Sequence, residues 1–185
     1  KTVEACGIAS RIVDISTPHE TLLKTIQPQL KEKGQERVEI SQLVDGNLRA
    51  RLRMATLYAI ANHYNYLVVG TDNAAEWHTG YFTKYGDGGV DLLPIVHLLK
   101  RDVYTWAEHL GVPQSVLDKA PSAGLWDGQD DETEMGITYD VIDDFLSGKP
   151  IPEDDRDKVE SMHQRTAHKR KTPQMPPKFA GGNLS

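Results

Sequence analysis

A short apolar run, Tyr66–Val69, followed at once by polar residues, most constrains how this chain can fold. Such a run, bounded by turn residues, is typical of a strand that is buried on both faces of a parallel sheet. Gly70 ends the run. The polar residues after it, Thr71–Asn73, occupy the position where the carboxyl ends of such strands bind ligands. We therefore expect an α/β protein whose functional site begins at Thr71.

Helical patterns alternate with two strand patterns along the chain. The other strand pattern is Arg11–Ile15, whose β-branched residues alternate with polar ones. Thr17 and Glu20 are spaced to form a capping box at the start of the first helix, and Pro28 should end or kink that helix. Further helices are expected over residues 47–63, 98–110, 138–148 and 153–166. This order favours a doubly wound parallel sheet with flanking helices. Because a two-stranded parallel sheet cannot stand alone, we expect the domain to be incomplete at its N-terminus.

Two further expectations concern which residues are buried and which are exposed to solvent. Trp106 and Leu110 fall on the apolar stripe of the helix over residues 98–110, so they should be buried. The acidic stretch over residues 127–134 should instead be a solvated surface segment.

Length and composition limit the class of protein. At 185 residues the chain is expected to form one domain, over residues 1–171, with an irregular tail over residues 172–185. Its net charge of −6 and pI ≈ 5.6 argue against a nucleic-acid partner. No apolar run approaches the ~20 residues needed to cross a membrane, and no signal peptide is visible. The single cysteine, Cys6, suits a reducing compartment, so we expect a cytoplasmic protein.

Three arginines lie within the apolar helix over residues 47–63. Arg49 and Arg53 are four residues apart and share a face, whereas Arg51 is turned about 200° from Arg49 at ~100° per residue. An arginine on an apolar face requires an anionic partner, because an unpaired buried charge is costly. Spacing alone leaves open whether that partner is a protein carboxylate or a bound ligand.

Asp72 and Glu76 form the first candidate ligand set. They are four residues apart, so on a helical turn their carboxylates point to one side. Mg²⁺ binds through one or two carboxylates together with water and phosphate oxygens. The alternative, which spacing alone favours, is that Asp72 caps a helix and Glu76 is solvated.

A glycine-rich loop, Gly86–Gly89, lies between two lysines, Lys84 and Lys100. Glycine-rich loops can direct backbone N–H groups at an anion, but this motif is weak and its composition favours a plain turn. Lys100 also begins a helix, where the helix dipole does not favour a cation, and so indicates an anion nearby. His168 and Lys169 are further candidates for phosphate or carbonyl binding, or else exposed surface. No Walker, dinucleotide-binding, zinc or serine-hydrolase motif is present.

Several segments of the chain, in order, resemble ammonia-dependent NAD synthetases over residues 1–171. The segments are Gly46–Met54, Val69–Glu76, Tyr81–Pro94, Ala120–Ala123, Gly136–Asp140 and Ala167–Arg170. The resemblance implies a homodimer with the ATP-pyrophosphatase type of α/β fold, also described as adenine-nucleotide alpha-hydrolase-like. It implies that ATP and Mg²⁺ adenylate the carboxylate of deamido-NAD, and that ammonia then displaces AMP to give NAD and leaves pyrophosphate as the other product.

The resemblance also implies roles for individual residues. Thr71, Lys100 and Ser122 would bind ATP, and Glu76 would bind Mg²⁺. Asp87 would lie near ammonium and help to deprotonate it, with Lys100 as the other catalytic residue. Deamido-NAD would be bound by five residues, namely Arg51, Lys84, Asp91, His168 and Lys169.

The chain departs from the family pattern in two ways. It does not contain the phosphate loop S-G-G-x-D-S, so we expect this polypeptide alone not to turn over. Ser122 stands where threonine is usual, which keeps the hydroxyl. Two alternatives to a synthetase stay open at this point: a non-catalytic dimerisation and dinucleotide-binding module, and an amidating ligase of the same fold with another carboxylate substrate.

Overall fold

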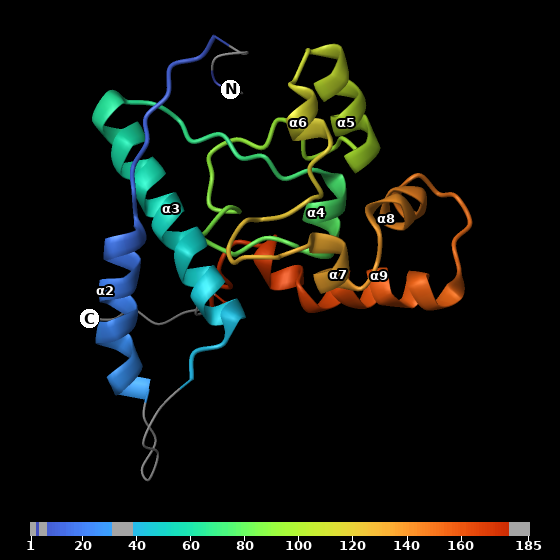
Figure 1. Ribbon diagram of the computed structural model, residues 1–185. Coiled ribbons are helices and arrows are strands. Elements are labelled where there is room, and N and C mark those ends of the chain that lie inside the picture. The colour runs from blue at the N-terminus through green and yellow to red at the C-terminus, as the bar shows by residue number, and fades with distance from the viewer. Residues whose placement is uncertain (1–2, 4–6, 31–38, 178–185) are drawn as a thin grey trace.

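The computed structural model describes residues 3, 7–30 and 39–177, and Figure 1 shows the arrangement of its helices. Helices α2 (Ser16–Ile26) and α3 (Gln42–Tyr64) lie along one side, and α4 (Ala74–Thr79) lies near the centre. The remaining helices follow on the other side: α5 (Lys100–His109), α6 (Gln114–Leu117), α7 (Asp131–Met135), α8 (Tyr139–Leu146) and α9 (Glu153–Arg165). Cys6 and the tail beyond residue 177 lie outside the described residues.

Helix α3 is the longest helix of the described residues. The Ser41 side chain accepts a hydrogen bond from the Val44 N–H and caps its start, and Asn65 ends it in the left-handed conformation (φ 55°). Helix α2 packs against α3, where His19 Nε2 lies 2.8 Å from Asp45 Oδ1. The two helices therefore form one unit.

The predicted start of the first helix is wrong, whereas its predicted end is confirmed. Helix α2 begins at Ser16, whose N–H donates to Asp14 Oδ1 at 2.9 Å, so Thr17 is inside the helix and forms no capping box with Glu20. The helix gives way to a short 3-10 turn, η1 (Gln27–Leu30), that contains Pro28. This end agrees with the loss of a backbone donor at proline.

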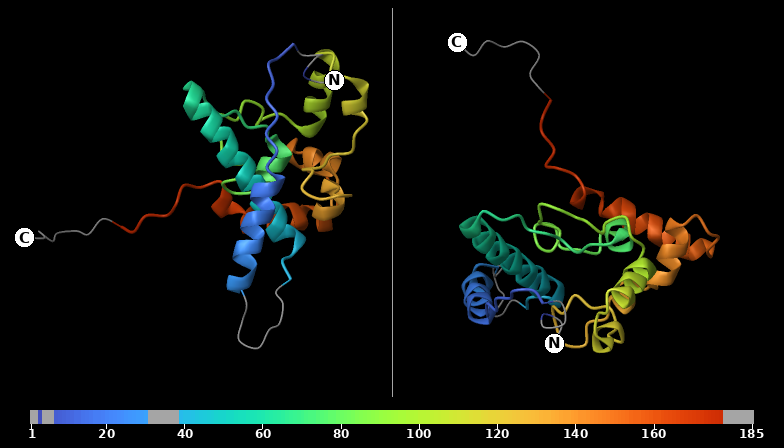
Figure 2. Two further views of the ribbon diagram at one scale, coloured as in Figure 1. Left: turned by 60° about the vertical axis from the view of Figure 1, so that its left-hand side comes forward. Right: turned by 90° about the horizontal axis from the view of Figure 1, so that it is seen from above.

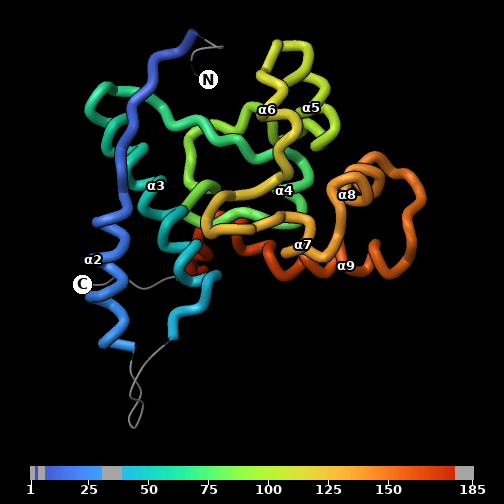
Figure 3. Tube along the Cα trace, viewed as in Figure 1, coloured from blue at the N-terminus to red at the C-terminus, as the bar shows by residue number. Residues whose placement is uncertain are grey.

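The two predicted strands do not form among the described residues. Val69 and Leu92 make an isolated parallel bridge, and the Gly70 N–H donates to Leu92 O at 2.8 Å. Val68 is 6% exposed, but Val69 on its other face is 55% exposed, so the run is not buried on both faces. Residues 11–15 form no helix, strand or bridge. Figure 3 shows residues 65–73 running beside the loop that contains Leu92, between α3 and α5.

The main apolar core lies where α4, α8 and α9 meet. It includes Ala75, Ile142 and Val159, which have no exposed surface. Helix α8 follows its sequence pattern closely, because Thr138 caps its start and Gly148 follows its end with φ +73°.

Helix α5 confirms the predicted helix but not its predicted burial. Trp106 is 55% exposed and Leu110 is 74% exposed, so the apolar stripe near its end faces outward. No helix among the described residues combines the length and apolar character needed to span a membrane. Figure 2 shows the chain leaving the body of the molecule after the last helical turn, η2 (Ala167–Lys169).

Candidate active site

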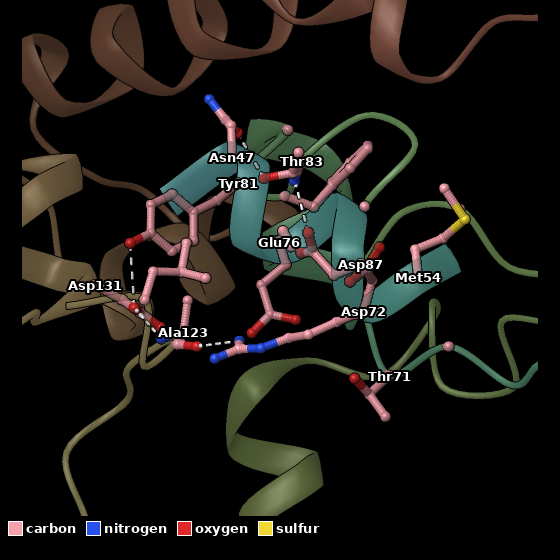
Figure 4. A pocket seen from close by; sticks show the side chains of 18 of the residues that line it. Asn47, Met54, Thr71, Asp72, Glu76, Tyr81, Thr83, Asp87, Ala123 and Asp131 are labelled. Carbon is pink, nitrogen blue, oxygen red and sulfur yellow. Dashed lines mark hydrogen bonds between the residues drawn. The ribbon is translucent and has the colours of Figure 1, made fainter. Parts of the chain in front are cut away.

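A pocket of about 800 Å³ lies between α3, the residues before α4, the loop after α4 and the start of α5. Figure 4 shows some of the side chains that line it. Six of the residues that the sequence predicted as functional are on its wall: Thr71, Glu76, Asp87, Lys100, Ser122 and Lys169. These residues are up to 98 positions apart in the sequence, and the fold brings them to one cavity.

Helix α4 starts at the pocket wall with a capping box. The Asn73 side chain accepts from the Glu76 N–H, and Glu76 Oε2 accepts from the Asn73 N–H, each at 3.0 Å. The other Glu76 oxygen, Oε1, lies 3.0 Å from Lys100 Nζ, and both side chains are largely buried. The cap is therefore Asn73 rather than Asp72, and Glu76 is not solvated.

Lys100 and Arg101 begin α5 with protein carboxylates beside them. The Asp143 carboxylate, which is fully buried, accepts from the backbone N–H groups of Lys100 and Arg101 at 3.1 and 2.9 Å. A negative charge there complements the helix dipole. The Arg101 side chain pairs with Asp143 and Asp144. The anion that sequence reasoning expected at this helix start is thus supplied by α8, while Lys100 Nζ extends to Glu76.

Two carboxyls, those of Asp72 and Asp87, lie close together on the pocket wall. Asp72 is 5% exposed, and burial, followed by repulsion from Asp87 and Glu76, raises its pKa to about 7. Burial also raises the pKa of Asp87, although its Oδ1 accepts from the Thr83 N–H at 2.9 Å. Lys169 nearby acts to lower the pKa of Asp87. This part of the pocket is therefore poised to hold or exchange a proton near neutral pH.

The glycine-rich loop is a turn whose N–H groups bond within the loop. The N–H groups of Gly86 and Gly88 donate to Thr83 O, and the Gly89 N–H donates to Gly86 O. A Cβ on Gly88 would lie 2.4 Å from the Phe82 ring, so this position requires glycine. The turn explanation is the correct one for these three N–H groups.

The loop that contains Ser122 is tied to α3 and α7. Arg53 donates to the carbonyls of Ala123 and Gly124 at 3.3 and 3.0 Å. Asp131 accepts from the Ala123 N–H and from the hydroxyls of Tyr81 and Tyr139. Since Asp131 is 5% exposed, the acidic stretch is not solvated throughout as predicted.

The C-terminal segment holds residues 77–82, part of which forms the pocket floor. Lys169 Nζ donates to the carbonyls of Gly80 and Phe82 at 2.8 and 2.7 Å. Thr166 and Arg170 bond the carbonyls of Thr79 and Trp77 in the same strip. Lys169 is therefore both a wall residue of the pocket and a structural clamp.

Four predicted site residues do not line this pocket. Three of them form a neighbouring group: Arg51 Nε donates to Lys84 O at 3.3 Å, and Lys84 Nζ donates to His168 O at 2.6 Å. The fourth, Asp91, accepts from the Tyr58 hydroxyl and the Val68 N–H. The partner of Arg51 in this structure is thus a backbone carbonyl.

Sequence reasoning missed several pocket residues that have no polar motif. Leu125 and Trp126 pack against Gly46 of α3, and Tyr81 links α7 to the pocket floor through its hydroxyl. Spacing in the sequence does not reveal such contacts, because they join segments that are far apart in the chain. No group of three His, Cys, Asp or Glu side chains that could hold a metal occurs in the part of the chain that the structure describes.

Comparison with known proteins gives one consistent result. A family model described as NAD synthase matches residues 1–173. An "NH(3)-dependent NAD(+) synthetase" from Alkaliphilus oremlandii (strain OhILAs) is 57% identical over 175 residues, which are 95% of this chain and 70% of that protein. A solved structure of NMN synthetase from Francisella tularensis has a TM-score of 0.85 and 45% identity, covering 96% of this chain and 70% of that one. An NH3-dependent NAD synthetase from Campylobacter jejuni, at 21% identity and a TM-score of 0.70, shares the fold over 95% of this chain and 69% of that one.

Proposed function

The chain belongs to the NAD synthase family, and on that premise we propose that it acts as an ammonia-dependent NAD synthetase. The reaction joins ammonia to the carboxylate of deamido-NAD and consumes ATP. An ionised carboxylate is a poor acyl donor, so the carboxylate is first adenylated and pyrophosphate leaves. Ammonia then displaces AMP and gives NAD.

One observation of the structure carries this proposal: the Glu76–Lys100 ion pair lies on the wall of the pocket. Glu76 Oε1 and Lys100 Nζ are 3.0 Å apart, and their side chains are 17% and 16% exposed. A cation and a carboxylate held together in this way are ready to separate when ATP supplies phosphate oxygens for Lys100. Lys100 then stabilises the negative charge of the departing pyrophosphate, and Thr71 and Ser122 add hydroxyl groups along the same wall.

The donor set at Glu76 fits Mg²⁺. Its carboxylate offers a hard oxygen, Oε1, that is now shared with a lysine and a tyrosine hydroxyl. Mg²⁺ needs only one or two protein carboxylates when phosphate oxygens and water complete its coordination. When bound, the ion neutralises charge on the triphosphate. Glu76 is the residue that would hold it.

We assign the binding of deamido-NAD to the side of the pocket near the C-terminal segment. Lys169 lies on the pocket wall, and Arg51, Lys84 and His168 form the group beside it. Three cationic or ionisable side chains near a lysine suit the two phosphates of a dinucleotide. Asp91, held by Tyr58 and Val68, extends this side. We propose in addition that the functional unit is a homodimer and that the reaction takes place in the cytoplasm.

Asp87 is the base for the amidation step in this account. Its carboxyl lies on the pocket wall, and its raised pKa makes it a better proton acceptor than an ordinary aspartate. Ammonium must lose a proton before its nitrogen can attack. A carboxylate on the pocket wall whose pKa is raised meets this need.

The test is an assay of the intact gene product, rather than of this polypeptide alone, with ATP, Mg²⁺, deamido-NAD and ammonium chloride. We expect NAD, AMP and pyrophosphate in equal amounts, and no NAD when either ATP or ammonium is omitted. Formation of ADP and phosphate in place of AMP and pyrophosphate would contradict the adenylation route. Binding of deamido-NAD without any turnover would instead favour a binding module.

A second candidate substrate is the mononucleotide with a free carboxylate, nicotinate mononucleotide. It is favoured by the 45% identity to a protein whose structure is described as an NMN synthetase. The same assay with each nucleotide at equal concentration separates the two. A kcat/KM that is at least about tenfold higher for the mononucleotide would assign the chain to that reaction, since tenfold corresponds to about 1.4 kcal/mol of discrimination.

A further inference from the structure

Lys100 is held at both of its ends by helix α8. The buried Asp143 carboxylate accepts a hydrogen bond from the Lys100 backbone N–H at 3.1 Å. At the far end of the side chain, Lys100 Nζ lies 4.3 Å from the centroid of the Tyr139 ring. Tyr139 and Asp143 are four residues apart on α8, so they lie on one face of that helix. One helix face therefore holds both the start of α5 and the ammonium group of its first residue.

The contact between Lys100 and Tyr139 is close and largely shielded from water. Tyr139 is 4% exposed, and the Lys100 side chain is 16% exposed. A distance of 4.3 Å is well within the ~6 Å over which a ring face attracts a cation, and it is the shortest such distance among the described residues. Loss of water strengthens this attraction. The ring is therefore a partner of Lys100 in addition to Glu76.

The Tyr139 hydroxyl contacts other groups than Lys100. It lies 3.2 Å from Asp131 Oδ2 and 3.4 Å from Glu76 Oε1, and it has one proton to donate. Because 3.4 Å is long for an O–H···O hydrogen bond, the contact with Glu76 is weak. The hydroxyl therefore anchors the ring mainly to Asp131, whereas the ring face is the part that contacts Lys100.

We propose that Tyr139 is a positioning residue for adenylation, and that its ring face keeps Lys100 Nζ in place when Lys100 separates from Glu76. The proposal rests on the function proposed above, in which Lys100 stabilises the departing pyrophosphate. A carboxylate cancels the charge of a lysine and so competes with phosphate for it. A ring face attracts the same charge without cancelling it, so the lysine can still bind phosphate oxygens.

The position of Tyr139 indicates that it acts through Lys100 rather than on a substrate. Tyr139 is not among the residues that line the larger pocket. It lies on the wall of a separate cavity of about 350 Å³, which Lys100 also lines. Lys100 is thus shared between the two cavities, with the ring on the wall of the smaller one.

The first test compares Tyr139→Phe, which keeps the ring, with Tyr139→Leu, which removes it, in the intact gene product. ATP–pyrophosphate exchange with deamido-NAD reports adenylation. We expect kcat of exchange to fall at least about tenfold in Tyr139→Leu, which corresponds to about 1.4 kcal/mol. The KM for deamido-NAD should stay within about twofold, because the ring acts only in the transition state. Tyr139→Phe should stay within about threefold in kcat, since it loses only hydrogen bonds of the hydroxyl.

The control for this comparison is Tyr66→Leu. Tyr66 is 67% exposed and lines neither cavity, so loss of its ring should leave exchange unchanged.

The second test separates an electrostatic role of the ring from a merely structural one. Tyr139 is replaced by phenylalanine and by its mono-, di- and trifluorinated derivatives. Fluorine withdraws electron density from the ring face and changes the size of the ring little. If the ring acts on the charge of Lys100, log kcat of exchange falls stepwise with each fluorine. A structural role would not follow this series, because every member fills the same space in the apolar core.

Three results would overturn the proposal: a loss in Tyr139→Phe as large as that in Tyr139→Leu, equal losses in Tyr139→Leu and Tyr66→Leu, or a constant kcat along the fluorinated series. If Tyr139→Leu does not fold, the fluorinated series decides alone, because all its members retain the ring. If the unchanged gene product shows no exchange, the proposed function is contradicted. The affinity for ATP, measured by calorimetry, then decides the role of the ring: it should weaken along the same series, and a constant affinity would overturn the proposal.

Discussion

Helix α4 lies between two regions of the molecule that differ in charge: an apolar core and a pocket that contains carboxyl groups. On one side Ala75 packs with Ile142 and Val159, all without exposed surface, in an apolar core. On the other side the start of the same helix presents Glu76 to the pocket, directly after the buried Asp72. The difference explains how the protein tolerates buried carboxyls in the pocket. Burying a carboxyl lowers the free energy of unfolding, and the apolar core offsets that loss. If this is correct, changes in the core should affect stability, and changes in the pocket should affect chemistry.

The largest expected effect on stability comes from the core. Ile142→Ala removes a fully buried side chain between α4, α8 and α9, and should lower the free energy of unfolding by about 2–5 kcal/mol through lost burial and a cavity. Ile12→Ala is the matched control, because Ile12 is 97% exposed and should change stability by no more than about 0.5 kcal/mol. Urea denaturation measures both. Equal effects of the two variants would remove the distinction between the regions.

The second prediction uses the opposite pH dependences of the two regions. On the core side, burial, His163 and Arg170 lower the pKa of His78 to about 4. Because the unfolded chain binds the proton near pH 6.5, the stability from neutral His78 is present above that pH and is lost as pH falls towards 4. On the pocket side, the raised pKa of Asp72, about 7, acts in the other direction. The stability that the protonated Asp72 carboxyl contributes is present below pH 3.8 and is lost as pH rises through 7.

Each variant should therefore reveal the dependence that the other residue causes. Between pH 4 and pH 7, Asp72→Asn should lose less stability than the unchanged protein as the pH rises. It should still lose stability on acidification, because His78 is unchanged. His78→Gln should still lose stability as the pH rises, because Asp72 is unchanged. Each contribution is of the order of a few kcal/mol. Free energies of unfolding measured from pH 4 to pH 8 check the signs, and identical slopes for the two variants would contradict them.

The smallest expected effect on stability comes from the loop that carries Ser122. Arg53→Ala removes two exposed hydrogen bonds to the carbonyls of Ala123 and Gly124, and should cost about 1 kcal/mol or less. It should raise KM for ATP severalfold, because the loop no longer holds Ser122 against the pocket. Arg49→Ala, on the same helix but paired with Asp45, is the control. An unchanged KM for ATP would show that this anchoring does not serve ATP.

Local signals in the sequence were sufficient to predict most helices. Helix α8 is the clearest case, because its cap, its apolar stripe and its final glycine lie within eleven residues. The predicted strand at Tyr66–Val69 is represented among the described residues only by the parallel bridge of Val69, because sheet formation depends on pairing with distant segments. Trp106 and Leu110 were placed wrongly for a related reason: a helical stripe does not say whether another element covers it.

The pocket was only partly predictable from the sequence. Thr71 and Glu76 follow a recognisable run, and the structure places both on the pocket wall. The burial of Asp131 was not foreseen, since its partners Tyr81 and Tyr139 are separated from it in the chain and give no local signal. Lys84 and Lys100 bracket the glycine-rich loop in the sequence, but only Lys100 lines the pocket, and Lys84 Nζ donates to His168 O. Which lysine faces a cavity depends on the packing of loops.

The most direct test of the account is the rate of adenylation by Glu76→Gln, measured as ATP–pyrophosphate exchange with deamido-NAD present. The glutamine keeps an oxygen that can accept the Asn73 N–H but loses the charge that pairs with Lys100 and would hold Mg²⁺. Glu160→Gln, exposed on α9, is the control. We predict that exchange is abolished in Glu76→Gln, while deamido-NAD still binds and the control is unaffected. Undiminished exchange in Glu76→Gln would contradict the assignment of this pocket as the active site.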